Sequence, residues 1–306
     1  MCTASVLAPE AWNELRIRHE ARIDAWVQPW LRRRAAGRKH PVEDFLFDYY
    51  NQSPARLRRW HPGADVRLAG PGCETFLRWR GYRAFGDTVG VDPVFVRRQA
   101  PLVRVLHSLL VATAGRPPSF GCLGLHEWAM VYRQSASERR HADWPLRLGS
   151  SGTDRVVESH HMRCTHFDAY RFFTEPATGR NALRPAAGDR ERFEQPGCLH
   201  TGMDLYKHAF RLSPMVGSGL VADCFELARD IREVDMRAAP YDLVELGYEP
   251  IPIETAPGKL SYIQAQRRLS ERAAPLRRRL VEACESLLAT GNGRPEGEHD
   301  GVDGEA

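Results

Sequence analysis

Lysine is scarce in this sequence of 306 residues: it occurs only as Lys39, Lys207 and Lys259, so arginine carries nearly all of the positive charge. The formal net charge of +4 is a mild excess, which permits nucleic acid as a partner without requiring one. A GC-rich genome explains such a preference for arginine as readily as phosphate binding does. The net charge alone therefore does not distinguish between classes of function.

Long apolar runs are absent. No segment approaches the roughly 20 apolar residues that span a bilayer, and the first residues, "MCTASVLAPEAWNELRIRHE", become charged before an apolar stretch develops. The seven cysteines are odd in number, widely scattered and without a CxxC pair, which argues against a disulfide framework and a zinc ribbon. We therefore expect a cytoplasmic protein that does not enter a membrane.

Apolar residues recur at helical spacing along most of the sequence. The pattern predicts a mainly α-helical protein with a minor β component, built as one compact domain over residues 1–290 or as two closely packed halves, 1–150 and 151–290. Residues 291–306 are acidic and glycine-rich, which predicts a disordered tail. The longer predicted helices cover 9–36, 93–114, 198–212, 218–236 and 260–289, and the predicted strands lie within 66–91, 145–149 and 154–159.

The segment "GCLHTGMDLYKHAF" places His200, Asp204 and His208 on one face of the helix predicted over 198–212. It resembles the metal-binding helix of heme-oxygenase-like dimetal oxidases, with the second histidine four residues after the aspartate where three is usual. Two histidines eight residues apart are separated by about 12 Å along a straight helix, so both cannot bind one ion. The helix supplies at most one pair of ligands to an ion.

Further histidines and carboxylates could complete such a site. His126 and Glu127 lie in the predicted helix 123–134, and His166 lies in the histidine- and aromatic-rich stretch 158–173. Glu226 and Asp230 share a helix face, where a metal-facing ridge competes with a lattice of salt bridges to nearby arginines. Histidine and carboxylate without a cysteine ligand favour iron or manganese. The metal candidates are His126, His166, His200, Asp204, His208, Glu226 and Asp230.

A second group of candidates concerns carboxylates that could act directly. Glu127 in an apolar helix needs an arginine, a metal or a raised pKa, because an unpaired buried carboxylate is costly. Asp168 follows Thr165 by three residues, which also fits a helix-capping role. "LSPMVGSGLVA" (212–222) resembles the hairpin of helix–hairpin–helix DNA glycosylases, and Asp235 then stands close to the place of their catalytic aspartate.

Over nearly its whole length, the sequence resembles an actinobacterial family commonly labelled 3-methyladenine DNA glycosylase. The segments that carry this resemblance include "FGCLGLHEWAMVYR", "THFDAYRFFT" and "PGCLHTGMDLYKHAFRLSP". It implies excision of alkylated purines from double-stranded DNA without a cofactor, by base flipping and a carboxylate. Under it, the carboxylates are Asp235, Asp168 and Glu127, the stacking rings are Tyr49, Tyr50, Trp60, Tyr170 and Phe172, and the phosphate contacts are Arg56, Arg58 and Arg59.

Three hypotheses of function follow. The first is the DNA glycosylase of base excision repair that the resemblance implies. The second is a mono- or dinuclear iron or manganese oxidase or oxygenase acting on a small molecule, which accounts for the histidines that a glycosylase leaves unused. The third is a non-catalytic binding protein whose polar groups are structural.

Overall fold

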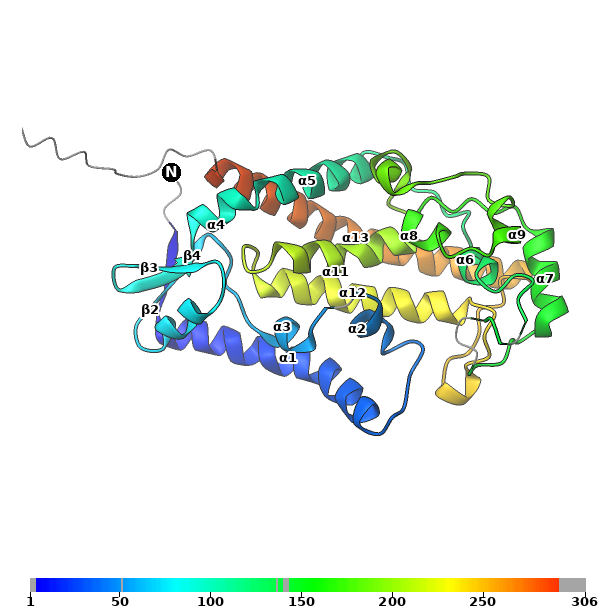
Figure 1. The fold of residues 1–306 in the computed structure, drawn as a ribbon, viewed down its shortest axis with the longest axis horizontal. Helices are drawn as coiled ribbons and strands as arrows, with labels where there is room; N and C mark the ends of the chain where they lie inside the picture. Colours follow the sequence, from blue (N-terminus) through cyan, green and yellow to red (C-terminus); the bar gives the residue numbers. More distant parts are fainter. Residues whose placement is uncertain (1–3, 51, 136, 140–142, 292–306) are drawn as a thin grey trace, which may run out of the picture.

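The long helices dominate the computed structural model, which describes residues 4–50, 52–135, 137–139 and 143–291. Figure 1 shows α11 (Leu199–Leu212), α12 (Ser218–Arg237) and α13 (Ala256–Gly291) running along the long axis of the molecule. α11 packs against α12 and α13, and α13 also packs against α5 (Ala100–Ala114). The mainly α-helical class is thereby confirmed.

A small sheet lies at one end of the molecule (Figure 1). Its order is β1-β2-β4-β3, with β1 (Ser5–Leu7) parallel to β2 (Val66–Ala69) and antiparallel pairing elsewhere. β3 (Tyr82–Phe85) and β4 (Thr88–Val91) form a hairpin, and the 3-10 helix η1 (Cys73–Arg78) lies between β2 and β3 in the chain. Leu68, Phe76 and Val89 pack with Trp12 into a core of their own, so the strands predicted within 66–91 are confirmed.

The N-terminal helices follow the sequence closely. α1 spans Pro9–Ala35, and the short helices α2 (Phe45–Tyr49) and α3 (Pro54–Arg58) come next. The helix predicted from Pro93 begins there, with the Asp92 carboxylate accepting a hydrogen bond from the Val94 amide. It divides into α4 (Pro93–Arg98) and α5 because Pro101 has no N–H and its ring clashes with a continuing turn.

The region between α5 and α11 differs most from the sequence-based expectation. Of the strand predicted at 145–149, only an isolated antiparallel bridge between Leu146 and Tyr241 forms. The strand predicted at 154–159 is wrong: α7 (Gly149–Ser159) covers it and buries Val156 and Val157. Packing of this valine face overrides the strand preference of β-branched residues. The same part of the chain also contains α6 (Leu125–Ala129), α8 (Phe167–Tyr170), α9 (Glu175–Thr178), η2 (Ala187–Asp189) and α10 (Arg190–Phe193), while η3 (Val244–Leu246) follows α12. α6 packs against α7, and α10 packs against α5.

The start of α8 also differs. His166, not Thr165, occupies its N-cap position, and no side chain caps it. The capping role considered for Asp168 is therefore wrong. Its carboxylate instead lies 3.0 Å from Lys207 Nζ and 3.2 Å from Arg171 Nε.

The largest hydrophobic core draws residues from along the chain, from Ile23 in α1 to Leu287 in α13. It therefore takes side chains from both halves of the sequence. Within the described ranges, no helix is both long enough and apolar enough to cross a membrane. The predicted tail, 291–306, lies outside the described residues except for Gly291, which ends α13.

Candidate metal centre

Three residues from distant parts of the chain meet in the core. His126 comes from α6, His200 from α11 and Asp235 from α12, and one ligand atom from each lies within 4.8 Å of the others. His126 Nε2 is 3.1 Å from Asp235 Oδ1, and the rings of His126 and His200 are 4.4 Å apart between centroids. All three are buried, and Asp235 has no exposed surface. We call these residues the triad.

The helix geometry of α12 explains why Asp235 belongs to the triad. Asp235 lies on the buried face together with Cys224, Ala228 and Ile231, which recur at helical spacing. Glu226 lies nine residues earlier, which is half a turn away, and therefore faces outward. Only one acidic residue of this inward face is thus available to the triad.

The approach of α6 to α12 depends on Gly124. Its φ of +69° is in the left-handed region that favours glycine. An added Cβ would lie 3.4 Å from Ala238 Cβ and from the Tyr262 hydroxyl. A glycine here thus allows α6, and with it His126, to pack closely against the end of α12.

The charges of the triad are strongly coupled. Burial alone would lower the pKa of His126, but Asp235 and Cys122 outweigh it and hold this pKa well above its ordinary value. Burial and the charge of His126 lower the pKa of His200. Burial would raise the pKa of Asp235, yet His126, His200 and Arg232 hold it below its ordinary value. These shifts favour a protonated His126 beside an ionised Asp235. A metal cation bound by both side chains would take the place of that proton.

One buried oxygen points to room for a cation. Glu127 Oε2 has no hydrogen-bond partner among the described residues, whereas Asp235 Oδ1 lies 3.1 Å from His126 Nε2. The other oxygen of Glu127 accepts a bond of 2.8 Å from Arg232 Nη1, so Glu127 is the structural ion pair considered from the sequence. Glu127 and His200 also line a cavity of about 20 Å³, enough for one water molecule or ion. These residues fit iron or manganese, since two imidazoles and a carboxylate are a familiar donor set for both.

A second cluster surrounds Asp204, one turn along α11 from His200. Asp204 Oδ2 lies 3.3 Å from His166 Nε2 and 2.7 Å from Arg190 Nη2, and Tyr50 donates to Asp204 Oδ1 at 2.9 Å. Lys207 Nζ is 3.4 Å away, and Glu194 pairs with Arg190 at 2.5 Å. We call these residues, His166, Asp204, Glu194, Arg190, Lys207 and Tyr50, the Asp204 cluster.

The Asp204 cluster already contains its own cations. Burial would raise the pKa of Asp204, but hydrogen bonding and charge from His166, with Lys207 nearby, hold it well below the ordinary value. Arg190 and Lys207 pair with the carboxylates of Asp204 and Glu194 and balance their charge, and the ligand atoms that could share one metal ion are those of the triad within the described residues. The arrangement therefore favours a single ion at the triad over a dinuclear centre.

The remaining predicted metal ligands lie away from the triad. His208 is buried further along α11, and burial lowers its pKa to about 3. Glu226 and Asp230 do not face a metal: Glu226 pairs with Arg22 of α1, and Asp230 lies 2.6 Å from Arg272 of α13. Their partners belong to neighbouring helices and not, as considered from the sequence, to α12 itself.

The carboxylate and rings predicted for a glycosylase are divided between several places. Tyr49, Phe172 and Asp168 line the small cavity beside His200. Tyr50 is buried with its hydroxyl on Asp204, and the Tyr170 hydroxyl is 3.5 Å from the Thr178 carbonyl. Trp60 is buried in the core under the sheet and cannot stack on a base there.

The predicted phosphate contacts lie at the other end of α11, which is about 20 Å long. Arg58 is held by Asp24 at 2.8 Å and by Glu20 at 3.3 Å. Arg56 and Arg59 instead lie against the rings of Phe210 and Trp79. None of these arginines lines the cavity beside His200.

Sequence reasoning missed Arg190, Glu194 and Lys207 as neighbours of the histidines. Arg190 and Glu194 lie in the segment 175–197 that was predicted as a loop, although their spacing of four is typical of a helical ion pair. Lys207 follows Asp204 by three residues and is one of only a few lysines in the chain. Both spacings were visible in the sequence.

Comparison of the chain with protein-family models, with curated proteins and with solved structures finds no match in any of the three. Function is therefore inferred from the chemistry and geometry of the site itself.

Proposed function

We propose that the triad binds one iron or manganese ion and that the protein is a metal-dependent oxidoreductase, an oxidase or oxygenase of a small molecule. The observation that supports this most is the convergence of His126, His200 and Asp235 from separate helices at a fully buried point. Two histidines and one carboxylate leave coordination positions free for small ligands, which is the arrangement that non-heme iron oxygenases use.

The surrounding residues have definable roles in such a centre. Arg232 Nη1 lies 3.5 Å from Asp235 Oδ2 and 2.8 Å from Glu127, so it orients both carboxylates. Cys122 Sγ lies 3.9 Å from His126 Nδ1, which leaves Nε2 of this ring for the metal. A hydrogen bond with Cys164 and burial raise the pKa of Cys122 well above its ordinary value, so the thiol is protonated while no metal is bound.

Access to the centre is narrow. The cavity beside His200 is covered by Phe45, Tyr49 and Phe172 together with Met130. At about 20 Å³ it admits a molecule of the size of water. A larger substrate reaches the centre only if these side chains move.

Metal analysis tests this proposal. We expect protein purified without a chelator to contain about one iron or manganese ion per chain. His200→Gln should lose it, since it removes an imidazole ligand at little change in volume. His208→Gln is the matched control, because His208 is an equally buried histidine of the same helix outside the triad.

A second readout separates loss of metal from loss of folding. Added Fe²⁺ or Mn²⁺ should raise the thermal midpoint of metal-free wild-type protein but not that of the folded His200→Gln variant. Equal metal content in wild type and His200→Gln would contradict the proposal, and about two ions per chain would contradict the mononuclear assignment.

Excision of alkylated bases is the second candidate, supported by one observation. Asp168, Tyr49 and Phe172 line one cavity, so a carboxylate stands among aromatic rings. Asp168 suits the task better than Asp235, which is sealed in the core and paired with His126. Release of free base from methylated duplex DNA, compared between wild type and Asp168→Asn, tests it. Metal-free protein that releases no base would favour a non-catalytic binding protein.

A further inference from the structure

A basic hollow of about 360 Å³ lies at the C-terminal end of α11, far from the triad. Four arginines reach it from three segments: Arg56 from α3 and Arg59 directly after it, Arg80 from the turn before β3, and Arg211 from α11. We call it the arginine hollow; its other lining residues are His61, Trp79, Phe95, Gln99, Phe210, Ser213 and Pro214. No acidic residue is among them.

The guanidinium groups here are held by aromatic rings. Arg59 lies 4.5 Å from the ring centroid of Trp79, Arg56 lies 5.1 Å from that of Phe210, and Arg80 lies 5.8 Å from that of Phe95. All three rings also line the hollow. A guanidinium stacked on a ring is fixed in position while its in-plane N–H donors stay free for an anion.

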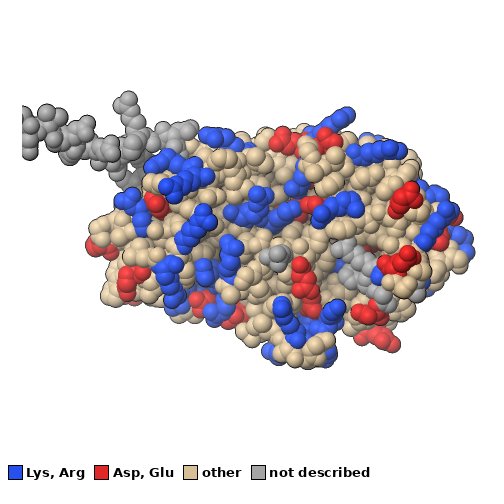
Figure 2. All heavy atoms as spheres, in the orientation of Figure 1, with Lys and Arg blue, Asp and Glu red and all other residues tan. Residues whose placement is uncertain are grey.

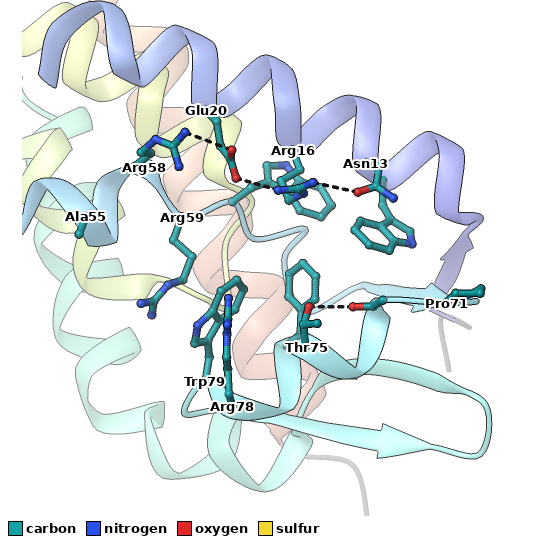
Figure 3. A pocket seen from close by; sticks show the side chains of 14 residues that line it. Asn13, Arg16, Glu20, Ala55, Arg58, Arg59, Pro71, Thr75, Arg78 and Trp79 are labelled. Carbon is teal, nitrogen blue, oxygen red and sulfur yellow. Dashed lines mark hydrogen bonds and ion pairs between the residues drawn. The ribbon is translucent and has the colours of Figure 1, made fainter. Parts of the chain in front are cut away.

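These arginines have no carboxylate partner within the part of the chain that the structure describes. Burial and the nearby charges of Arg56 and Arg78 lower the pKa of Arg59, which means that its positive charge is uncompensated. The neighbouring hollow of about 720 Å³, drawn in Figure 3, is different: there Glu20 pairs with both Arg16 and Arg58. Figure 3 also shows Arg59 and Arg78 beside Trp79. Arg59 and Trp79 line both hollows, whereas Arg78 lines only the larger one.

We propose that the arginine hollow binds a small phosphorylated molecule that carries a diphosphate or triphosphate group. Several fork-shaped donors around one hollow match the oxygens of adjacent phosphates, which bind arginine in bidentate fashion. A volume of about 360 Å³ is within the usual range of small-molecule sites. The site is independent of the metal proposed at the triad.

A strand of nucleic acid fits the hollow less well. Proteins that bind single strands offer free aromatic faces on which successive bases stack. Here Trp79, Phe95 and Phe210 are each occupied by a guanidinium. Figure 2 shows basic side chains gathering over the end of the molecule that carries the sheet, which would help an anion to approach.

Calorimetric titration with inorganic pyrophosphate tests the proposal. We expect saturable binding of one pyrophosphate per chain in about 0.15 M salt, at least about tenfold tighter than binding of sulfate. The double variant R56Q/R80Q should weaken pyrophosphate binding about 100-fold or more, because each of the two lost charged hydrogen bonds is worth about 1.5–3 kcal/mol. Arg59→Lys should also weaken it, although it keeps the charge.

Matched controls separate the hollow from net charge and from the metal. Arg38 and Arg278 are exposed arginines outside the hollow, so R38Q/R278Q removes the same charge and should leave pyrophosphate binding unchanged within about twofold. His200→Gln should bind pyrophosphate like wild type. Equal weakening by both double variants would overturn the proposal. So would binding of a single-stranded oligonucleotide, but not of pyrophosphate or ADP, that depends on Arg56 and Arg80.

Discussion

The charged side chains near the two ends of α11 differ in whether an opposite charge lies beside them. Near its start, the buried carboxylates of Asp204 and Glu194 lie beside His166, Arg190 and Lys207. Beyond its end, the arginines of the hollow face one another with no acidic side chain among the residues that line it. The protein itself balances the first set, whereas the second set remains unbalanced until an anion arrives.

Burial explains the difference. A charge removed from water is strongly destabilising unless an opposite charge lies beside it, so buried ionic groups occur as pairs and networks. In the arginine hollow, Arg59 is half-buried, whereas Arg56, Arg80 and Arg211 are exposed, so all four keep contact with water and their mutual repulsion is tolerable. Uncompensated charge that persists at a concave surface therefore indicates a ligand more strongly than balanced charge in the core does.

The largest effect is expected in the buried core, where one arginine is the partner of two carboxylates. Arg232 is 1% exposed and bonds to Glu127, Asp235 and the Pro41 carbonyl. Arg232→Met should lower the free energy of unfolding by about 3–5 kcal/mol, because it leaves two buried carboxylates without their positively charged partner. Arg272→Met removes the exposed pair with Asp230 and should cost less than about 1 kcal/mol. Similar losses in urea denaturation for both variants would refute the distinction.

Uncompensated positive charge around the hollow should appear in the pH dependence of stability. Burial, with Arg59 and other nearby cations, lowers the pKa of His61 to about 3, and its Nδ1 atom contacts the Tyr82 hydroxyl at 2.9 Å. In the unfolded chain the pKa of histidine is about 6.5. Between pH 6.5 and 3, His61 binds a proton in the unfolded state but not in the folded state. The free energy of unfolding is therefore unaffected by His61 above pH 6.5 and falls as the pH decreases toward 3.

The difference between the pKa of His61 in the folded and unfolded states sets how much stability is lost at low pH. His61 should lower the free energy of unfolding by about 1.4 kcal/mol per pH unit below 6.5, or by about 2.7 kcal/mol at pH 4.5. His61→Asn, whose amide oxygen can replace Nδ1 as acceptor, should reduce the slope of unfolding free energy against pH by about this amount. An unchanged slope would show that the hollow does not suppress protonation of His61. Pyrophosphate should also flatten the wild-type slope, because it neutralises the arginines.

The sequence predicted the parts of the site that depend on helix geometry. His200, Asp204 and His208 lie on one buried face of α11, as their spacing of four indicated, and the long helices have nearly the predicted bounds. The role of Asp235 on the apolar face of α12 was also open to the same argument, because Cys224, Ala228 and Ile231 precede it at helical spacing.

What could not be predicted is which helix faces which. Glu226 and Asp230 share a helix with Asp235, yet only the packing of α1 and α13 against α12 assigns their partners, Arg22 and Arg272. Several helices between α5 and α11, among them α10, have only one turn, so the sequence predicts a loop there. The β-branched Val156 and Val157 favour a strand where α7 forms. His126, Arg190 and Glu194 all come from this region.

A smaller effect separates hydrogen bonds to buried and to exposed carboxylates. The Tyr50 hydroxyl donates to buried Asp204, whereas the Tyr132 hydroxyl donates at 2.8 Å to Glu158, whose side chain is 39% exposed. Tyr50→Phe should lower the free energy of unfolding by about 2 kcal/mol, since a charged acceptor loses a donor that water cannot replace. Tyr132→Phe should cost about 0.5 kcal/mol. Equal losses in urea denaturation would mean that the Asp204 cluster is reached by water.

The smallest predicted effect concerns two neighbouring arginines: Arg58, the last residue of α3, and Arg59, which follows it. Arg58 is paired with Asp24 and Glu20 and is 44% exposed, so Arg58→Gln should cost about 0.5 kcal/mol and leave pyrophosphate binding unchanged. Arg59 has only cations and a ring around it, so Arg59→Gln should relieve repulsion, raise stability by a few tenths of a kcal/mol, and weaken pyrophosphate binding about tenfold. If urea denaturation shows that Arg58→Gln is less stable and Arg59→Gln more stable than wild type, and only Arg59→Gln loses pyrophosphate binding, the uncompensated charge of Arg59 serves ligand binding. If Arg59→Gln is instead less stable and still binds pyrophosphate, the charge of Arg59 does not serve ligand binding.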